Sequence, residues 1–193
     1  MKHMKRSVLS VTVASIIGLM SILFWYKMPA HADENVNIQL IEAAYNGDLA
    51  GVQGALSQGA DIQFKDQVFG LTQLMYACSE GHADITQELI SKGARLNEQD
   101  NDKGLTPLMY AAWRGFDDIA ILLIANGANV KTKDRADGIT ALMIASLYGN
   151  IAIVRILLEN GADIDATDNA GKTARDYAFE YNQTDILEML NAA

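Results

Sequence analysis

Apolar and polar positions follow a pattern that repeats from about residue 36 to the end of the chain. In one copy, Ile119, Leu122 and Leu123 form an apolar face at the spacing of an α-helix, after a shorter apolar stretch that also reads as a helix. A fixed period predicts an all-α repeat solenoid, because one such unit cannot bury its apolar face alone. Glycines open the successive copies at spacings of 34, 34 and 33 residues, at Gly70, Gly104, Gly138 and Gly171.

One copy shows why each residue type falls where it does. Thr106 can cap a helix whose first position is Pro107, where the missing N–H leaves no hydrogen bond unmade. Gly115 predicts the end of that helix, since the left-handed conformation of a helix end suits glycine. A second helix follows and ends near Gly127, and an extended return leads to the next copy.

The repeated motifs resemble the ankyrin repeat. Residues 70–81 read GLTQLMYACSEG, residues 104–115 read GLTPLMYAAWRG and residues 138–149 read GITALMIASLYG. The units close with GARLNEQD, GANVKTKD and GADIDATD. The resemblance covers roughly Val36 to Ala193, and several motifs in register are far more specific than one. It implies ankyrin repeats, each with a helix-turn-helix and a β-hairpin or loop.

The same register predicts the boundaries of the units. Residues 36–66 form a degenerate N-terminal capping repeat, in which Gly51 and Gly54 weaken the second helix. Full repeats follow at residues 67–100, 101–134 and 135–168, and residues 169–193 form a C-terminal capping repeat. Terminal repeats need polar outer faces to avoid end-to-end association. In the last repeat these polar positions are Arg175, Glu180, Gln183 and Glu188.

Two features depart from the ankyrin pattern. The histidine that usually follows Thr-Pro-Leu in this family is replaced by Met75, Met109 and Met143. Its hydrogen bonds are therefore expected to be absent, with methionine packing in their place. The first three hairpins also hold one extra residue, within 67–69, 101–103 and 135–137, and such variation belongs at exposed hairpin tips.

The N-terminal segment predicts export. Lys2, Lys5 and Arg6 form a positive end, and a small-x-small cleavage pattern ends at Ala32, so residues 1–32 are interpreted as a signal peptide. The uncharged run at residues 8–26 is 19 residues long, which also suits a membrane span. An uncleaved inner-membrane anchor is therefore the alternative. Both place the repeats in a bacterial periplasm, because the positive charges stay inside.

The charge after Ala32 is strongly negative. All 24 acidic residues and 11 of the 15 basic ones follow Ala32, which leaves a net charge of −13. Such a domain repels nucleic acid and anionic lipid, and it favours a partner with a basic surface. The alternative is that these carboxylates serve only solubility and helix starts.

The sequence offers few groups for catalysis. Cys78 and His82 are the one cysteine and the one histidine after Ala32, so a His–Cys metal set and an internal disulfide are excluded there. Cys78 takes the register position of Ala112 and Ser146, which predicts a small buried side chain rather than a redox thiol. For His82 we expect packing or capping rather than metal ligation.

Residues 100–104, with the sequence DNDKG, faintly resemble a calcium loop. The glycine comes fifth rather than sixth, and the twelfth residue is Ala111 rather than a bidentate glutamate, so we reject this site. No phosphate-binding loop or nucleophile elbow is present in the sequence. We therefore predict no enzymatic activity, no cofactor and no metal site.

The predicted function is binding of another protein. In the ankyrin family, partners usually bind the hairpin tips and the adjoining face of the first helices. The resemblance carries this role to Phe69, Leu71, Asp102, Lys103, Leu105, Arg135, Asp137 and Ile139 on the hairpins. On the first helices it carries to Ser79, Glu80, Trp113, Arg114, Leu147 and Tyr148.

Trp113 and Tyr148 are the expected centre of this surface, since Trp and Tyr concentrate binding energy. Leu71, Leu105 and Ile139 have the alternative role of packing between hairpins. We expect a monomeric protein whose partner is an envelope enzyme, a toxin or a component of an assembly. A membrane-tethered structural scaffold is the alternative function.

Overall fold

The computed structural model describes residues 32–193, with side chains from Val36 onward. The chain divides into Met1–Glu34 and Asn35–Ala193, and the described residues lie almost entirely in the second unit. The predicted signal peptide or anchor thus lies outside the described residues, apart from Ala32. Over residues 32–193, no helix is both long enough and apolar enough to cross a membrane.

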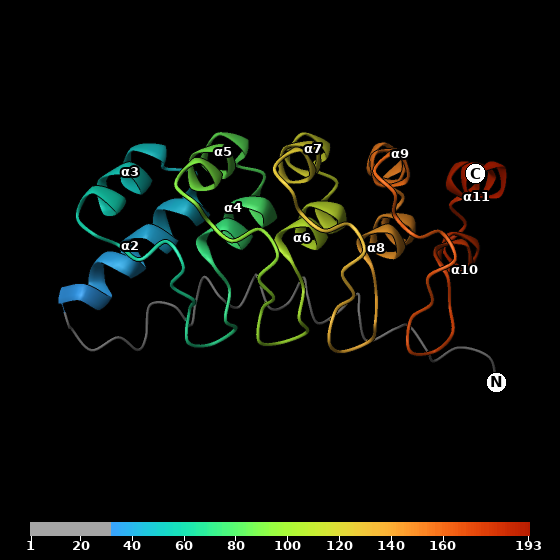
Figure 1. The fold of residues 1–193 in the computed structure, drawn as a ribbon, viewed down its shortest axis with the longest axis horizontal. Coiled ribbons are helices and arrows are strands. Elements are labelled where there is room, and N and C mark those ends of the chain that lie inside the picture. The colour runs from blue at the N-terminus through green and yellow to red at the C-terminus, as the bar shows by residue number, and fades with distance from the viewer. Residues whose placement is uncertain (1–31) are drawn as a thin grey trace. The chain divides into compact units, whose positions relative to one another are not determined.

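Ten helices in this part of the chain pair into five units that stand side by side (Figure 1). The first helices are α2 (Ala32–Asn46), α4 (Gln73–Glu80), α6 (Pro107–Arg114), α8 (Ala141–Tyr148) and α10 (Ala174–Glu180). The second helices are α3 (Leu49–Ser57), α5 (Ala83–Ser91), α7 (Asp117–Ala125), α9 (Ile151–Glu159) and α11 (Thr184–Ala192).

The first helices form one row and the second helices form another, and the loops between units turn in hairpins beyond the first helices (Figure 1). Among the described residues, strand pairing is limited to isolated bridges between Lys65 and Thr72 and between Lys133 and Thr140. The predicted all-α repeat solenoid is confirmed.

The predicted helix ends also appear in the structure. The Thr106 hydroxyl caps α6 by accepting a hydrogen bond from the Met109 N–H, and Pro107 is the first helical residue. Gly115 ends α6 with a φ of +82°, in the left-handed region. In the last unit, Asn182 takes this conformation with a φ of +56°, as the residue type that tolerates it best after glycine.

The methionines that replace the family histidine do more than pack. The Thr106 N–H donates to the Met109 sulfur at 3.4 Å, and the pairs Thr72–Met75 and Thr140–Met143 repeat this contact. The expectation of packing alone is therefore incomplete, since each of these sulfurs also accepts one backbone N–H. The thioether sulfur is a weak acceptor. In the last unit, the Asp176 carboxylate accepts the Thr173 N–H at 2.7 Å instead.

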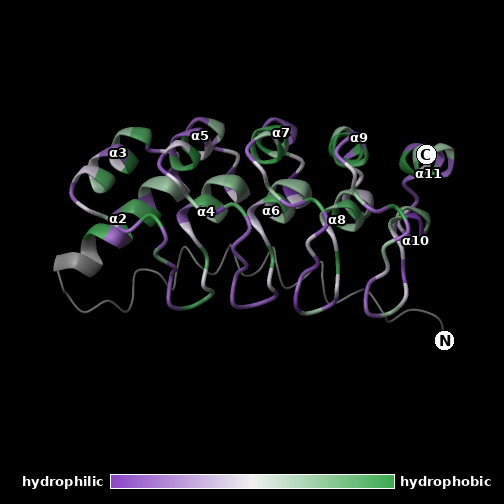
Figure 2. Cartoon of the chain, in the orientation of Figure 1, coloured by the Kyte–Doolittle hydropathy of each residue, from purple (hydrophilic) through white to green (hydrophobic). Residues whose placement is uncertain are grey.

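The core lies between the two rows of helices and between neighbouring units, and Figure 2 shows the apolar residues concentrated on the helices rather than on the hairpins. The three full units supply the same register positions. These are Leu74, Leu108 and Leu142 on the first helices, and Ile85, Ile119, Ile153, Leu89, Leu123 and Leu157 on the second. Cys78 is fully buried, and burial raises the pKa of its thiol to about 12. This confirms the prediction of a small buried side chain.

The last unit exposes one large apolar side chain at its outer end. Arg175 takes the register position that Leu74, Leu108 and Leu142 hold in the full units. Its Nε donates to the Leu190 carbonyl at 3.0 Å, and a polar residue suits this outer end of the solenoid. Phe179 stands in the register of Cys78 and Ala112 but is 72% exposed. The expected polar outer face is therefore interrupted at Phe179.

Candidate protein-binding surface

A buried aspartate organises each hairpin. In the hairpin that joins the first and second full repeats, the Asp100 carboxylate accepts hydrogen bonds from the backbone N–H groups of residues 102–105, at 2.8–3.1 Å. The Tyr110 hydroxyl from α6 donates to the same carboxylate at 2.9 Å, which ties the hairpin to the first helix. Burial, and then the charge of Asp100, raise the pKa of Tyr110 above its ordinary value.

This arrangement explains the acidic motif at residues 100–104. The carboxylate that would lead a calcium loop is occupied by donors from its own backbone. No group of three potential metal ligands occurs among the described residues. The motif is therefore a structural feature of the hairpin.

The aspartate recurs in the other units, with one difference. Tyr76 donates to Asp66 at 3.3 Å and Tyr177 donates to Asp168 at 2.7 Å. Asp134 has no tyrosine partner because Ile144 takes that register position. Its carboxylate accepts only backbone N–H groups, including that of Ile139 at 2.8 Å.

Backbone hydrogen bonds join the hairpins into one row. Asn101 N–H donates to the Phe69 carbonyl at 2.7 Å, and Asn169 N–H donates to the Asp137 carbonyl at 2.8 Å. Between them, Arg135 N–H donates to the Lys103 carbonyl at 2.9 Å. The predicted contact residues at the tips therefore stand on a connected support.

Aromatic side chains line the C-terminal ends of the first helices. The ring centroids of Trp113 and Tyr148 lie 6.2 Å apart across the boundary between two units, and those of Tyr110 and Trp113 lie 6.5 Å apart. Tyr148 is 36% exposed and Trp113 is partly exposed. Burial raises the pKa of Tyr148, so its hydroxyl is neutral at physiological pH. The structure therefore brings the two expected central residues together.

His82, Asn150 and Gln183, which each follow a left-handed residue at the end of a first helix, reach back to the preceding unit. His82 Nε2 lies 3.0 Å from the Tyr45 carbonyl oxygen, and Asn150 Nδ2 donates to the Ala112 carbonyl at 2.7 Å. Gln183 Nε2 donates similarly to the Leu147 carbonyl at 3.4 Å. His82 thus makes a cross-unit contact of the packing kind expected for it.

Several predicted contact residues are buried. Leu71, Ile139 and Leu147 are 7%, 4% and 7% exposed, and Ser79 is also buried. These four side chains therefore offer little surface to a partner. For Leu71 and Ile139 this burial agrees with the alternative of packing between hairpins. The residues that remain at least partly exposed are Phe69, Glu80, Asp102, Lys103, Leu105, Trp113, Arg114, Arg135, Asp137 and Tyr148.

Two exposed apolar residues on this surface were missed by the sequence analysis. Val68, beside Phe69 at a hairpin tip, is 75% exposed. Tyr181 is 41% exposed and takes the register position of Tyr148 in the last unit. The spacing of 33 residues between these two tyrosines is the signal that could have found the second one.

The hairpins and first helices from α4 onward carry balanced charge. Apart from the buried hairpin aspartates, five acidic and five basic residues occur there. They are Glu80, Asp102, Asp137, Asp176 and Glu180, with Lys103, Arg114, Arg135, Lys172 and Arg175. Some pair with each other: Lys172 Nζ lies 2.8 Å from Glu180 Oε1, and Arg114 Nη2 lies 3.7 Å from Glu80 Oε2.

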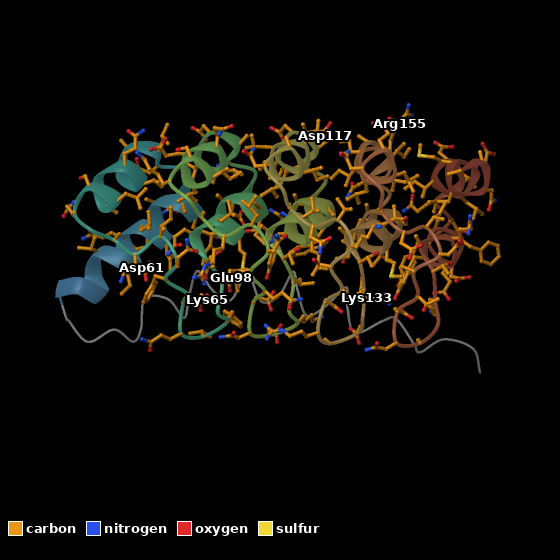
Figure 3. The ribbon with its side chains drawn as sticks, in the orientation of Figure 1. Asp61, Lys65, Glu98, Asp117, Lys133 and Arg155 are labelled. Atoms are coloured by element: carbon orange, nitrogen blue, oxygen red, sulfur yellow. The ribbon has the colours of Figure 1, made fainter. Side chains whose placement is uncertain are left out.

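The excess of negative charge lies elsewhere. The second helices, with their N-caps and the segments that follow them, carry twelve acidic and six basic residues. Figure 3 places Asp117 and Arg155 at the outer edge of the second-helix row, and Glu98 and Lys133 on segments that run toward the hairpins. Within these segments Lys65 Nζ and Glu98 Oε2 form an ion pair at 2.7 Å, which lowers the pKa of Glu98.

Comparison with known protein families supports the repeat register. A family model described as ankyrin repeats (3 copies) matches residues 40–134 and 130–192. No curated protein matches the chain. The matched residues cover both rows of helices and every hairpin. The chain belongs to the ankyrin-repeat family.

Proposed function

We propose that this chain is an exported protein that binds another protein of the cell envelope through the surface around Trp113 and Tyr148. Ankyrin repeats are generally protein–protein interaction modules. The observation that carries the proposed site is the exposed aromatic pair, held 6.2 Å apart across two units. The partner is an enzyme, a toxin or a component of an assembly.

The physical argument for this site is that its side chains lose little conformational entropy when a partner binds. Trp and Tyr side chains offer large contact area with few rotatable bonds, and they dominate many protein interfaces once a partner removes water. Here both rings already contact each other and stand on helices that pack within the solenoid. A partner would therefore need to order little more than its own side chains.

The distribution of charge bears on the prediction that the partner has a basic surface. The domain's net negative charge would attract such a partner at long range. At the proposed contact surface, however, acidic and basic residues are equal in number. We therefore propose that apolar contact with the aromatic pair, rather than charge, supplies the short-range binding energy.

Export rests on the N-terminal sequence alone. The positive end, the apolar run and the cleavage pattern support a periplasmic protein, and the length of the apolar run supports an anchored form facing the periplasm as the alternative. The mass of the exported protein separates the two. Loss of residues 1–32 supports the periplasmic form, and retention supports a membrane-tethered scaffold.

The test of binding is an affinity capture from envelope extract. The protein is compared with the variant Trp113→Ala/Tyr148→Ala and with the control variant Ile121→Ala/Ile151→Ala, which truncates two exposed apolar residues on the second helices. All three should show the same helical circular dichroism. We expect a captured protein that is lost only with the aromatic double variant. Equal capture by all three would refute this site, and no specific capture would refute the binding function.

A further inference from the structure

In the unit that contains α6, the hydrogen bond to the preceding unit comes from a different register position than in the other units. Phe116 stands at the position from which Asn150 Nδ2 and Gln183 Nε2 each donate at 3.4 Å to a carbonyl of the preceding unit, that of Trp113 and that of Leu147, but its ring has no donor. Ser79 takes the register position of Trp113 and Leu147, so its carbonyl is the one that a donor at residue 116 would reach. Arg114 takes over this role, and its Nε donates to the Ser79 carbonyl at 2.9 Å.

The same guanidinium also covers Trp113. Its Cζ lies 5.7 Å from the centroid of the indole ring, within the range of a cation–π contact. Its Nη2 lies 3.7 Å from the Glu80 carboxylate, so the charge faces an opposite charge within the protein. Trp113 therefore contacts Arg114 on its own helix and Tyr148 on the next unit.

We propose that Arg114 is a positioning residue, which holds Trp113 in the orientation that contacts the partner and does not itself supply the main partner contact. This inference rests on the proposed function of the Trp113 surface. The reason is that the Nε of Arg114 is committed to Ser79 and its charge to Glu80 and the indole. An indole fixed before binding loses less conformational freedom when the partner arrives.

The experiment separates positioning from simple support of the fold. Trp25→Phe in the full chain leaves Trp113 as the sole tryptophan, since the sequence has two. Into this background we would introduce Arg114→Ala, with and without Phe116→Asn. The asparagine offers a donor to the Ser79 carbonyl, as Asn150 Nδ2 does at 3.4 Å to the matching Trp113 carbonyl in the next unit, but it leaves the indole uncovered.

The readouts are quenching of Trp113 fluorescence by acrylamide, limiting anisotropy of that fluorescence, and urea unfolding. We expect Arg114→Ala to increase quenching, lower the anisotropy and reduce stability. Adding Phe116→Asn should recover the stability but neither fluorescence signal. Unchanged quenching and anisotropy in Arg114→Ala would overturn the inference. Recovery of both signals together with stability would also overturn it, because Arg114 would then act only as a structural clamp.

If Arg114→Ala by itself does not fold, we would compare the fluorescence of Arg114→Ala/Phe116→Asn and of Arg114→Lys with that of the Trp25→Phe background. Lysine keeps the charge but lacks the Nε donor and the planar group, so it should restore the fluorescence signals only in part.

These fluorescence and unfolding measurements need no partner protein. A negative result in them would contradict the positioning role of Arg114, whereas a negative capture experiment would contradict the binding function. With a captured protein in hand, Arg114→Ala in the Phe116→Asn background should weaken binding roughly three- to tenfold, the ordering cost of one side chain. A loss as large as that of Trp113→Ala would instead make Arg114 a direct contact.

Discussion

One residue on each first helix decides whether the hairpin aspartate accepts a tyrosine hydroxyl. Asp168 accepts the Tyr177 hydroxyl, and although burial raises its pKa, this bond together with backbone donors and the Lys172 charge brings the pKa below its usual value. Asp134 faces Ile144 instead of a tyrosine, and there burial raises the pKa above its usual value despite backbone donors. The two carboxylates therefore respond to pH in opposite ways.

The direction of each response follows from the pKa shifts. Asp168 stabilises the fold above the pKa of an unfolded aspartate, about 3.9, and this contribution is lost as the pH falls through its lower folded pKa. Asp134 has a raised folded pKa, so its ionised form costs stability above that pKa. This cost disappears once the pH falls below the unfolded value.

We therefore expect Ile144→Tyr to stabilise the protein near neutral pH. The new hydroxyl would donate to the ionised Asp134 and lower its pKa, at a position where Tyr76 and Tyr110 already fit in other units. The expected gain in the free energy of unfolding is about 1 kcal/mol at pH 7, measured by urea unfolding.

The control is Ile144→Phe, which fills the same space without a hydroxyl. An equal gain from phenylalanine would show that packing, and not the hydrogen bond, is responsible. A gain that persists undiminished at pH 3 would also contradict the role of the ionised carboxylate.

Among the helices, α3 is the one that its own sequence weakens most. Gly54 lies in its interior, and a Cβ there would meet nothing within 4 Å. Gly51 differs, because its N–H donates to the Asp48 N-cap at 2.9 Å and a Cβ would approach that carboxylate closely. The two glycines thus have different reasons to be present.

These surroundings predict opposite results for the same substitution. Gly54→Ala should raise the free energy of unfolding by roughly 0.5–1 kcal/mol, because alanine has the higher helix propensity and the site is open. Gly51→Ala should give no gain or a loss, because the added methyl displaces the N-cap of α3. Thermal or urea unfolding of the two variants measures the difference, and equal gains would contradict the N-cap argument.

In the solenoid, each unit is stabilised by its own core and by its neighbours. The units containing α4 to α9 have a neighbour on both sides, whereas α2 and α3 pack against one described unit only. Because α3 also contains two interior glycines, we expect the first unit to open more readily than the middle of the row.

Hydrogen exchange tests this expectation. Amides of α3 should exchange faster than those of α7, which holds the same place in a central unit. Gly54→Ala should slow exchange in α3 and leave α7 nearly unchanged. Uniform protection along the row would mean that the protein opens as one cooperative block.

Much of the fold could be read from the sequence because its determinants are local and repeated. Thr106, Pro107 and Gly115 set the bounds of α6 through caps that involve only nearby residues. The apolar positions of the second helices predicted the buried face correctly, as Ile119 and Leu123 show. Repetition in register made these signals unambiguous and led to the family.

The binding surface was less predictable, because exposure depends on side chains about 34 residues away. Leu71, Leu105 and Ile139 share one register position, yet Leu105 is partly exposed while the other two are buried. Arg114 was expected at the partner interface, but its Nε contacts a carbonyl of the preceding unit because Phe116 cannot.

The sequence alone therefore determined the period, the helix pairs and the core, since caps and apolar spacing act within one unit. Only the tertiary structure decided which surface side chains are free to meet a partner, because contacts between stacked units cover some members of each register position and leave others open.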